Sequence, residues 1–233
     1  MITKYGYDVY WTIAAGCLVL VVLSFLFIEP RAARYGVSAV AILALAFATN
    51  FFRDPDRSTP ADDSAVISPA DGKVILIREA RSAEFMQGDA IQVSIFMSPL
   101  DVHVNRNPVS GVVRYMRYVK GEYFAAFEDK ASEKNEQMIV GIENGRGKVL
   151  MKQIAGFVAR RIVCSLALNE RVVAGERFGM IKFGSRVDLL LPNNSHVRVH
   201  VGDRTVAGET VLATLGPSFD PRGVKPGSIP SHP

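Results

Sequence analysis

The chain has 233 residues, of which 48% are hydrophobic, and a formal net charge of +4 at pH 7. This length suits one domain of ordinary size and an additional segment. The positive charge is diffuse and no basic run carries interleaved aromatic residues, which excludes a nucleic-acid-binding footprint. Cys17 and Cys164 lie far apart and fit no metal-ligand spacing. We therefore expect two thiols in a reducing compartment, with no disulfide and no metal site.

Two long uncharged segments dominate the start of the chain. Residues 9–28 form an uncharged run of twenty residues, long enough to cross a bilayer, and residues 36–52 form one of seventeen, at the short limit. A cleaved signal peptide is the alternative for the first run. Its basic start is weak, because Lys4 is followed by Asp8, and no small-x-small cleavage pattern follows the run. We predict a membrane hairpin or paired interfacial helices over residues 1–52.

A polar segment interrupted by prolines, residues 53–64, is predicted to be a linker. From there to residue 216, short runs of β-branched residues alternate with turn residues, and one helix is predicted at 123–130. This spacing indicates a mainly β (α+β) domain over 65–216, built as an antiparallel barrel or sandwich, and a flexible tail over 217–233. The predicted strands span residues 74–77, 90–96, 111–118, 137–142, 147–154, 160–164, 187–191 and 196–201.

The pair Gly184–Ser185 is the most informative short motif. An isolated pair of this kind usually marks a turn or a bulge before a strand. Here it lies between the block 171–179 and an alternating strand, and two earlier blocks, 68–72 and 96–105, stand in a matching order. With these blocks the chain resembles the short form of the phosphatidylserine decarboxylase family. The resemblance covers most of residues 65–215 and extends to the hydrophobic N-terminus.

The resemblance implies a pyruvoyl-dependent lyase that is made as a zymogen. The Ser185 hydroxyl would attack the Gly184 carbonyl, and elimination and hydrolysis would leave fragments 1–184 and 185–233, which stay associated, with a pyruvoyl group at position 185. This ketone would form a Schiff base with phosphatidylserine, whose decarboxylation yields phosphatidylethanolamine in phospholipid biosynthesis. It would replace pyridoxal phosphate as the electron sink, so neither that cofactor nor a metal is expected. Glycine suits position 184 because it leaves the carbonyl open to attack.

A serine hydroxyl needs a base and an oxyanion donor to become a nucleophile. His103, with an ordinary pKa near 6.5, can take the proton, and the resemblance places Asp71 where the family has an acid that could orient the ring. The structural alternatives are a turn-forming Asp71 before Gly72 and a partly buried strand histidine. Longer family members have a second histidine where this chain has Arg106, so the role of that histidine cannot be carried over.

Substrate contacts are predicted at two places. Arg114 and Arg117 could hold the lipid phosphate, although their alternation with apolar residues is also typical of an ordinary half-exposed strand. Asn135 and Glu136 match a family segment near the site. Residues 85–86 and 123–127 are apolar in polar surroundings and could dip into lipid. We expect the protein at the cell membrane, with the catalytic domain on the cytoplasmic face, and a homodimer is compatible with the sequence.

Two alternatives remain open. One is a decarboxylase acting on another serine-headgroup lipid, such as an ether-linked one. The other is a non-enzymatic adaptor at the membrane, because turn motifs at 172–176 and 201–209 resemble those of lipoyl- and biotinyl-type barrels. A carrier of that type needs a lysine at a hairpin tip, and the candidate tips at 145–147 and 192–195 have no central lysine.

Overall fold

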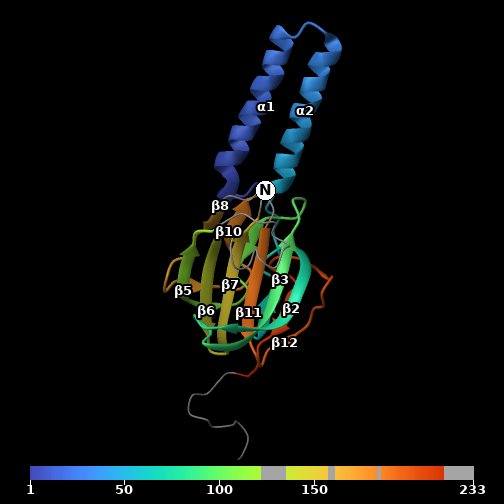
Figure 1. The fold of residues 1–233 in the computed structure, drawn as a ribbon. Helices are drawn as coiled ribbons and strands as arrows, with labels where there is room; N and C mark the ends of the chain where they lie inside the picture. Colours follow the sequence, from blue (N-terminus) through green and yellow to red (C-terminus); the bar gives the residue numbers. More distant parts are fainter. Residues whose placement is uncertain (122–134, 157–160, 183–184, 218–233) are drawn as a thin grey trace, which may run out of the picture.

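The computed structural model describes residues 1–121, 135–156, 161–182 and 185–217. A helical hairpin projects from one end of a β domain (Figure 1). The helix predicted at 123–130, Gly184 and all but the first residue of the predicted tail lie outside the described residues.

The hairpin consists of α1 (Tyr7–Phe27) and α2 (Arg31–Phe51), preceded by a short 3₁₀ helix, η1 (Lys4–Gly6). Arg34 closes the turn between them by donating from Nη2 to the carbonyl of Ile28, 2.9 Å away. Both helices are long and apolar enough to cross a membrane. Large apolar side chains such as Leu18 and Leu43 point away from the protein, at 66% and 69% exposure. The predicted N-terminal hydrophobic hairpin is confirmed.

The β domain contains three antiparallel sheets among the described residues, which confirms the predicted mainly β architecture. The largest has the strand order β13-β2-β3-β11-β7-β6-β5-β9 and curls into a half-barrel (Figure 1). Two three-stranded sheets, β4-β10-β8 and β1-β14-β12, complete the domain. The strands are β1 (Ala65–Ile67), β2 (Gly72–Ser82), β3 (Gly88–Met97), β4 (Val104–Arg106), β5 (Gly111–Val119), β6 (Gln137–Asn144), β7 (Gly147–Ala155), β8 (Arg161–Cys164), β9 (Arg171–Val172), β10 (Arg177–Lys182), β11 (Ser185–Pro192), β12 (His196–Val197), β13 (Arg204–Thr205) and β14 (Val211–Thr214).

The core lies inside the curl of the large sheet. Alternate residues of β11, namely Val187, Leu189 and Leu191, point into it, as the two-residue period of a strand requires. Phe178 of β10 and Leu212 of β14 fill the core from the smaller sheets. The side chains on the core face of β11 are therefore buried in a packed interior.

A second apolar cluster joins the hairpin to the β domain. Tyr5 and Phe51 from the base of the hairpin pack with Val104 of β4 and Met180 of β10. The Tyr5 hydroxyl also donates to the carbonyl of Arg177, 3.1 Å away. These contacts fix the base of the hairpin against the edge of the domain that carries β8 and β10 (Figure 1).

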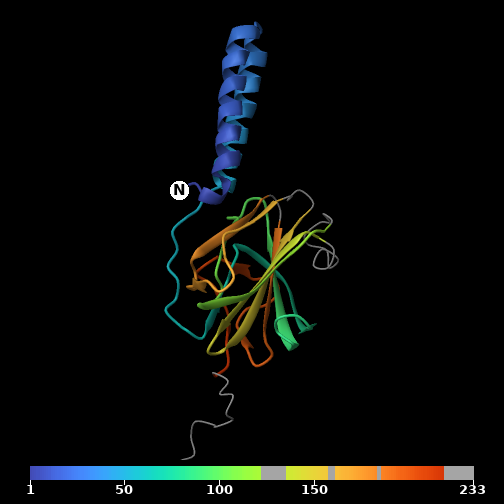
Figure 2. The same ribbon diagram turned by 90° about the vertical axis from the view of Figure 1, so that its left-hand side faces the viewer.

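The predicted linker, residues 53–64, is bound along the outside of the β domain (Figure 2), and we call it the strap. Asp54, at 4% exposure, accepts from Arg177 Nε at 2.8 Å and lies 3.5 Å from Arg106 Nη2. Arg106 also donates to the carbonyls of Pro55 and Gly175, each 2.9 Å away. Arg106 thus ties the strap to the domain with a buried guanidinium.

Candidate active site

Ser185 begins β11 and lies between Met97 of β3 and Ala155 of β7. Its side chain shares the core-facing side of β11 with Val187 and is fully buried. The hydroxyl donates to the sulfur of Met97 at 3.2 Å. A thioether is a weak acceptor, so the hydroxyl is loosely held in a dry environment.

Two primary amides lie beside Ser185 on the same interior side. Gln153 Nε2 donates to Asn105 Oδ1 at 2.8 Å, and Asn105 Nδ2 lies 3.3 Å from the carbonyl of Pro69 and 3.7 Å from the Met97 sulfur. The Met97 sulfur therefore contacts both Ser185 and Asn105. Gln153 Oε1 is buried and has no hydrogen-bond partner among the described residues.

The sequence interpretation missed this amide pair as a site. The available signal was in β7, where Val149, Met151 and Ala155 occupy core-facing positions and Gln153 interrupts the apolar series. Burying an amide that keeps an unpaired oxygen costs free energy, so such a residue in a core is a functional candidate.

Asn135 and Glu136 both contact Ala155 of β7. Asn135 Nδ2 donates to the Ala155 carbonyl at 2.7 Å, and the Ala155 amide donates to the Glu136 carbonyl at 3.0 Å. Because Ala155 is the direct cross-strand partner of Ser185, the structure brings both predicted substrate contacts close to Ser185. Both are buried.

His103 is fully buried between the β domain and the hairpin. Its Nδ1 lies 2.9 Å from the Asp101 carbonyl, which only a protonated nitrogen can satisfy, so we assign the neutral ring a free lone pair on Nε2. No described group hydrogen-bonds to Nε2. Burial lowers the pKa of His103 to about 4, despite opposing contributions from the Asp101 carbonyl and carboxylate. The ring is therefore an unprotonated acceptor at neutral pH.

Asp71 has other partners than His103. Its carboxylate lies 2.9 Å from Arg57 Nη2 of the strap and accepts from the Ala207 amide at 2.7 Å. Burial raises the pKa of Asp71, while the Ala207 amide and the Arg57 charge act in the opposite direction. Among the described hydrogen bonds, none joins Asp71 to His103, so the expected orienting contact is absent from this state of the chain.

Arg114 and Arg117 are not gathered around Ser185. Arg114 donates to Asn169 Oδ1 at 2.9 Å, and Arg117 pairs with Glu84 at 2.6 Å, both on the exposed side of β5. Two strands, β6 and β7, separate β5 from β11, which places β5 roughly 14 Å from it in a flat sheet. Neither arginine has a described hydrogen bond or ion pair with Ser185 or Ala155.

The apolar residues predicted to dip into lipid are also placed differently. Phe85 and Met86 lie between β2 and β3, at the opposite end of β3 from Met97, and Phe85 stacks on Tyr115 with ring centroids 5.9 Å apart. Residues 123–127 lie outside the described residues. Near the Ser185 end, Leu100 is 66% exposed, and its carbonyl accepts from Arg53 just after α2.

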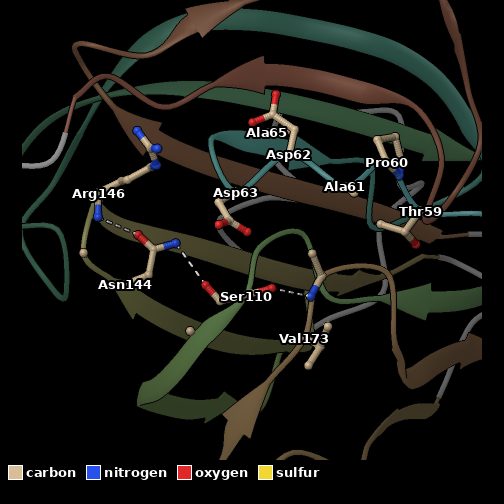
Figure 3. A pocket seen from close by; sticks show the side chains of 13 residues that line it. Thr59, Pro60, Ala61, Asp62, Asp63, Ala65, Ser110, Asn144, Arg146 and Val173 are labelled. Carbon is tan, nitrogen blue, oxygen red and sulfur yellow. Dashed lines mark hydrogen bonds between the residues drawn. The ribbon is translucent and has the colours of Figure 1, made fainter.

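A cavity of about 690 Å³ lies elsewhere (Figure 3). Strap residues 59–63 line it together with Ser110, Asn144 and Arg146, and hydrogen bonds join the last three in sequence. Asn144 is at the far end of β6 from Gln137, roughly 23 Å along the strand from the end near Ser185. The candidate site is therefore identified by the side chains around Ser185 and not by this cavity. The described residues contain no group of three or more potential metal ligands.

Comparison with known proteins decides the family. A family model described as phosphatidylserine decarboxylase matches residues 44–213. The chain belongs to this family. Relatives named phosphatidylserine decarboxylase proenzyme include that of Chlorobium phaeobacteroides, 45% identical over 212 residues, and that of Chlorobium luteolum, 47% identical over 214 residues. Each match covers 91% of this chain and 99% of the relative.

Membership of the phosphatidylserine decarboxylase family confirms the resemblance seen in the sequence and the expectation of an enzyme, a lyase of the decarboxylase type. It decides against the lipoyl-like adaptor. The printed names describe the relatives as proenzymes, which agrees with a zymogen.

Proposed function

We propose that this protein decarboxylates phosphatidylserine to phosphatidylethanolamine at a membrane surface, with a pyruvoyl group made from its own Ser185. The observation that carries the proposal is the Gly184–Ser185 pair, whose serine begins a buried central strand in a chain of this family. The activity in the names of the relatives supports the substrate.

The chain's own residues suit the formation of the group. Attack of Ser185 Oγ on the Gly184 carbonyl forms an ester as the peptide C–N bond breaks. Elimination then breaks the Cβ–Oγ bond, leaving a carboxylate on Gly184, and hydrolysis releases ammonia and leaves a ketone. The Met97 sulfur holds the hydroxyl weakly, so little is lost when Oγ turns to attack.

The surroundings of position 185 also suit an electron-sink cofactor. A pyruvoyl group supplies a ketone that condenses with an amine and accepts the electron pair left by departing CO2. Asn135 and Glu136 contact Ala155, the cross-strand partner of Ser185, and the Asn105–Gln153 pair supplies polar groups on the core side. No described hydrogen bond joins His103 to Ser185, and the buried Nε2 of His103 can accept a proton. We assign proton transfer to His103 and substrate orientation to Asn135 and Glu136.

The position of the site supports a lipid substrate. Lys182, three residues before Ser185, lies 3.1 Å from Asp8 at the base of the hairpin. The two apolar helices extend from that end (Figure 1). The exposed Leu100 is joined to it through the hydrogen bond from Arg53 to its carbonyl. A headgroup at the surface of a bilayer that holds the hairpin would therefore be level with Ser185. We place the β domain on the cytoplasmic side, in keeping with two free thiols, Cys17 and Cys164.

The decisive experiment is intact mass measurement of the purified chain with Ser185→Ala and Ser94→Ala as a matched pair. Ser94 is also a buried serine, on the neighbouring strand β3. The wild type and Ser94→Ala should give fragments 1–184 and 185–233, and Ser185→Ala should remain one chain without decarboxylase activity. Borohydride with phosphatidylserine vesicles should label the fragment that starts at position 185. A label found only on a lysine, or a cut elsewhere, would refute the proposal.

A further inference from the structure

Asp8 in the first turn of α1 contacts β10, the strand that leads into the proposed self-cleavage site, and its neighbour β8. Its Oδ1 lies 3.1 Å from Lys182 Nζ at the end of β10, and its Oδ2 lies 3.6 Å from Arg161 Nη1 at the start of β8. Lys182 and Arg161 are themselves cross-strand partners. One carboxylate of the hairpin thus joins two strand ends.

Lys182 depends on this contact more than Arg161 does. Its side chain is 5% exposed, whereas those of Asp8 and Arg161 are 60% and 69% exposed. Asp8 is the hydrogen-bond partner that the described residues offer to Nζ. A buried ammonium without a counter-ion is strongly unfavourable. The ion pair with Asp8 therefore fixes the position of the Lys182 side chain.

The two reacting groups of the proposed self-cleavage are positioned by different elements. Ser185 is fixed by its ladder with β3 and β7. Gly184 is two residues beyond Lys182, where the ladder of β10 with β8 ends. Lys182 is therefore the last described residue before the Gly184 carbonyl that Ser185 would attack. An error of about 1 Å in the approach of two reacting groups can cost roughly a hundredfold in rate.

We propose that Asp8 is a positioning residue for self-cleavage, which holds Lys182 so that the Gly184 carbonyl meets the Ser185 hydroxyl. This inference rests on the proposed cleavage at Gly184–Ser185. It makes the membrane hairpin part of the machinery that forms the cofactor, in addition to an anchor. A chain whose hairpin is not docked would therefore be cut more slowly.

The test follows the appearance of the two fragments with time after synthesis of the full chain in the presence of lipid vesicles. Asp8→Asn keeps the shape of the side chain and removes its charge, and Glu29→Gln, at the other end of the hairpin, is the matched control. We expect Asp8→Asn and Lys182→Met each to slow cleavage about tenfold or more, and Glu29→Gln to leave it unchanged. The double variant should be no slower than either single one, because both remove the same contact.

A second readout separates positioning from folding. In the uncut Ser185→Ala background, Lys182→Met removes the contact without leaving a buried charge unpaired, so it should leave the denaturant midpoint nearly unchanged. Equal cleavage rates in Asp8→Asn and the wild type would overturn the inference, as would slow cleavage in Lys182→Met matched by an equal loss of stability. Absence of cleavage in the wild type would instead refute the proposed function, so the two failures are distinguishable.

Discussion

The imidazole of His103 lies against the ring of Phe51, with ring centroids 4.2 Å apart and an interplanar angle of 34°. Phe51 ends α2, so the last turn of the hairpin covers the one histidine that the sequence assigned to catalysis. This contact helps to keep water from the ring, which is the cause of its low pKa.

The first prediction concerns stability against pH. The pKa of His103 is about 4 in the folded chain and near 6.5 when unfolded, so between these values the unfolded chain binds a proton that the folded chain excludes. Stability should therefore fall as pH falls, by about 2 kcal/mol between pH 7.5 and pH 5 from this group. Urea unfolding of Ser185→Ala, with and without His103→Leu, measures the difference. An unchanged pH dependence in His103→Leu would contradict it.

The second prediction concerns catalysis by His103. His103→Ala should reduce self-cleavage, turnover or both by about two to four orders of magnitude, because it removes the buried proton acceptor. His200→Ala is the control, since that side chain is 91% exposed. Fragment formation and CO2 release are measured separately. Normal values for both in His103→Ala would remove His103 from the mechanism.

The third prediction concerns Asp71 and follows from its ion pair with Arg57. Asp71→Asn should weaken attachment of the strap, and the change should be mimicked by Arg57→Gln. If Asp71 acts through the strap, the two substitutions should affect cleavage equally and less than additively in combination. A cleavage defect in Asp71→Asn that Arg57→Gln does not share would instead support a direct role beside His103.

The fourth prediction concerns the amide pair. Gln153→Met should destabilise the Ser185→Ala chain by about 1–3 kcal/mol, because Asn105 Oδ1 loses its donor. The double variant Asn105→Leu, Gln153→Met should recover most of that loss, since no polar group is then left unpaired. With Ser185 restored, the double variant should nevertheless cleave or turn over more slowly than the wild type. Full activity would show that the amides serve the fold alone.

The fifth prediction concerns Arg106. Arg106→Ala should cost about 3 kcal/mol or more, because the buried Asp54 and the carbonyls of Gly175 and Pro55 lose a donor. Arg106→His should not restore stability, although longer family members have histidine there, because an imidazole cannot reach all three partners. Arg114→Ala is a surface control and should change the unfolding free energy by less than about 0.5 kcal/mol.

Local patterns predicted the architecture well. The uncharged runs specified the hairpin, and alternation in segments such as 187–191 specified strands, because burial on one side imposes a period of two. The strand predicted at 196–201 ends at Val197, since Asp203 captures the His200 amide in a turn. That turn depends on a side chain outside the predicted segment.

The site was harder to predict than the fold. Ser185 and His103 could be named from motifs, and Asn135 does lie near Ser185, through its hydrogen bond to Ala155. The hydrogen-bond partners of the site residues could not be predicted, because they come from distant segments of the chain. Arg57 reaches Asp71 only because of the path of the strap, and Gln153 meets Asn105 only because the sheet curls. Pairings of this kind depend on tertiary packing rather than on local sequence.

The central position of β11 has a kinetic consequence for a molecule that is cut just before it. The shorter fragment would carry β11 to β14, with β11 bonded on both sides to strands of the longer fragment. Unfolding such a nicked molecule releases two chains, and regaining the fold requires that they meet again. Its recovery after heat or denaturant would therefore depend on concentration, whereas that of the uncut chain would not. Maturation would convert a chain that can refold alone into an assembly whose refolding requires two chains to meet.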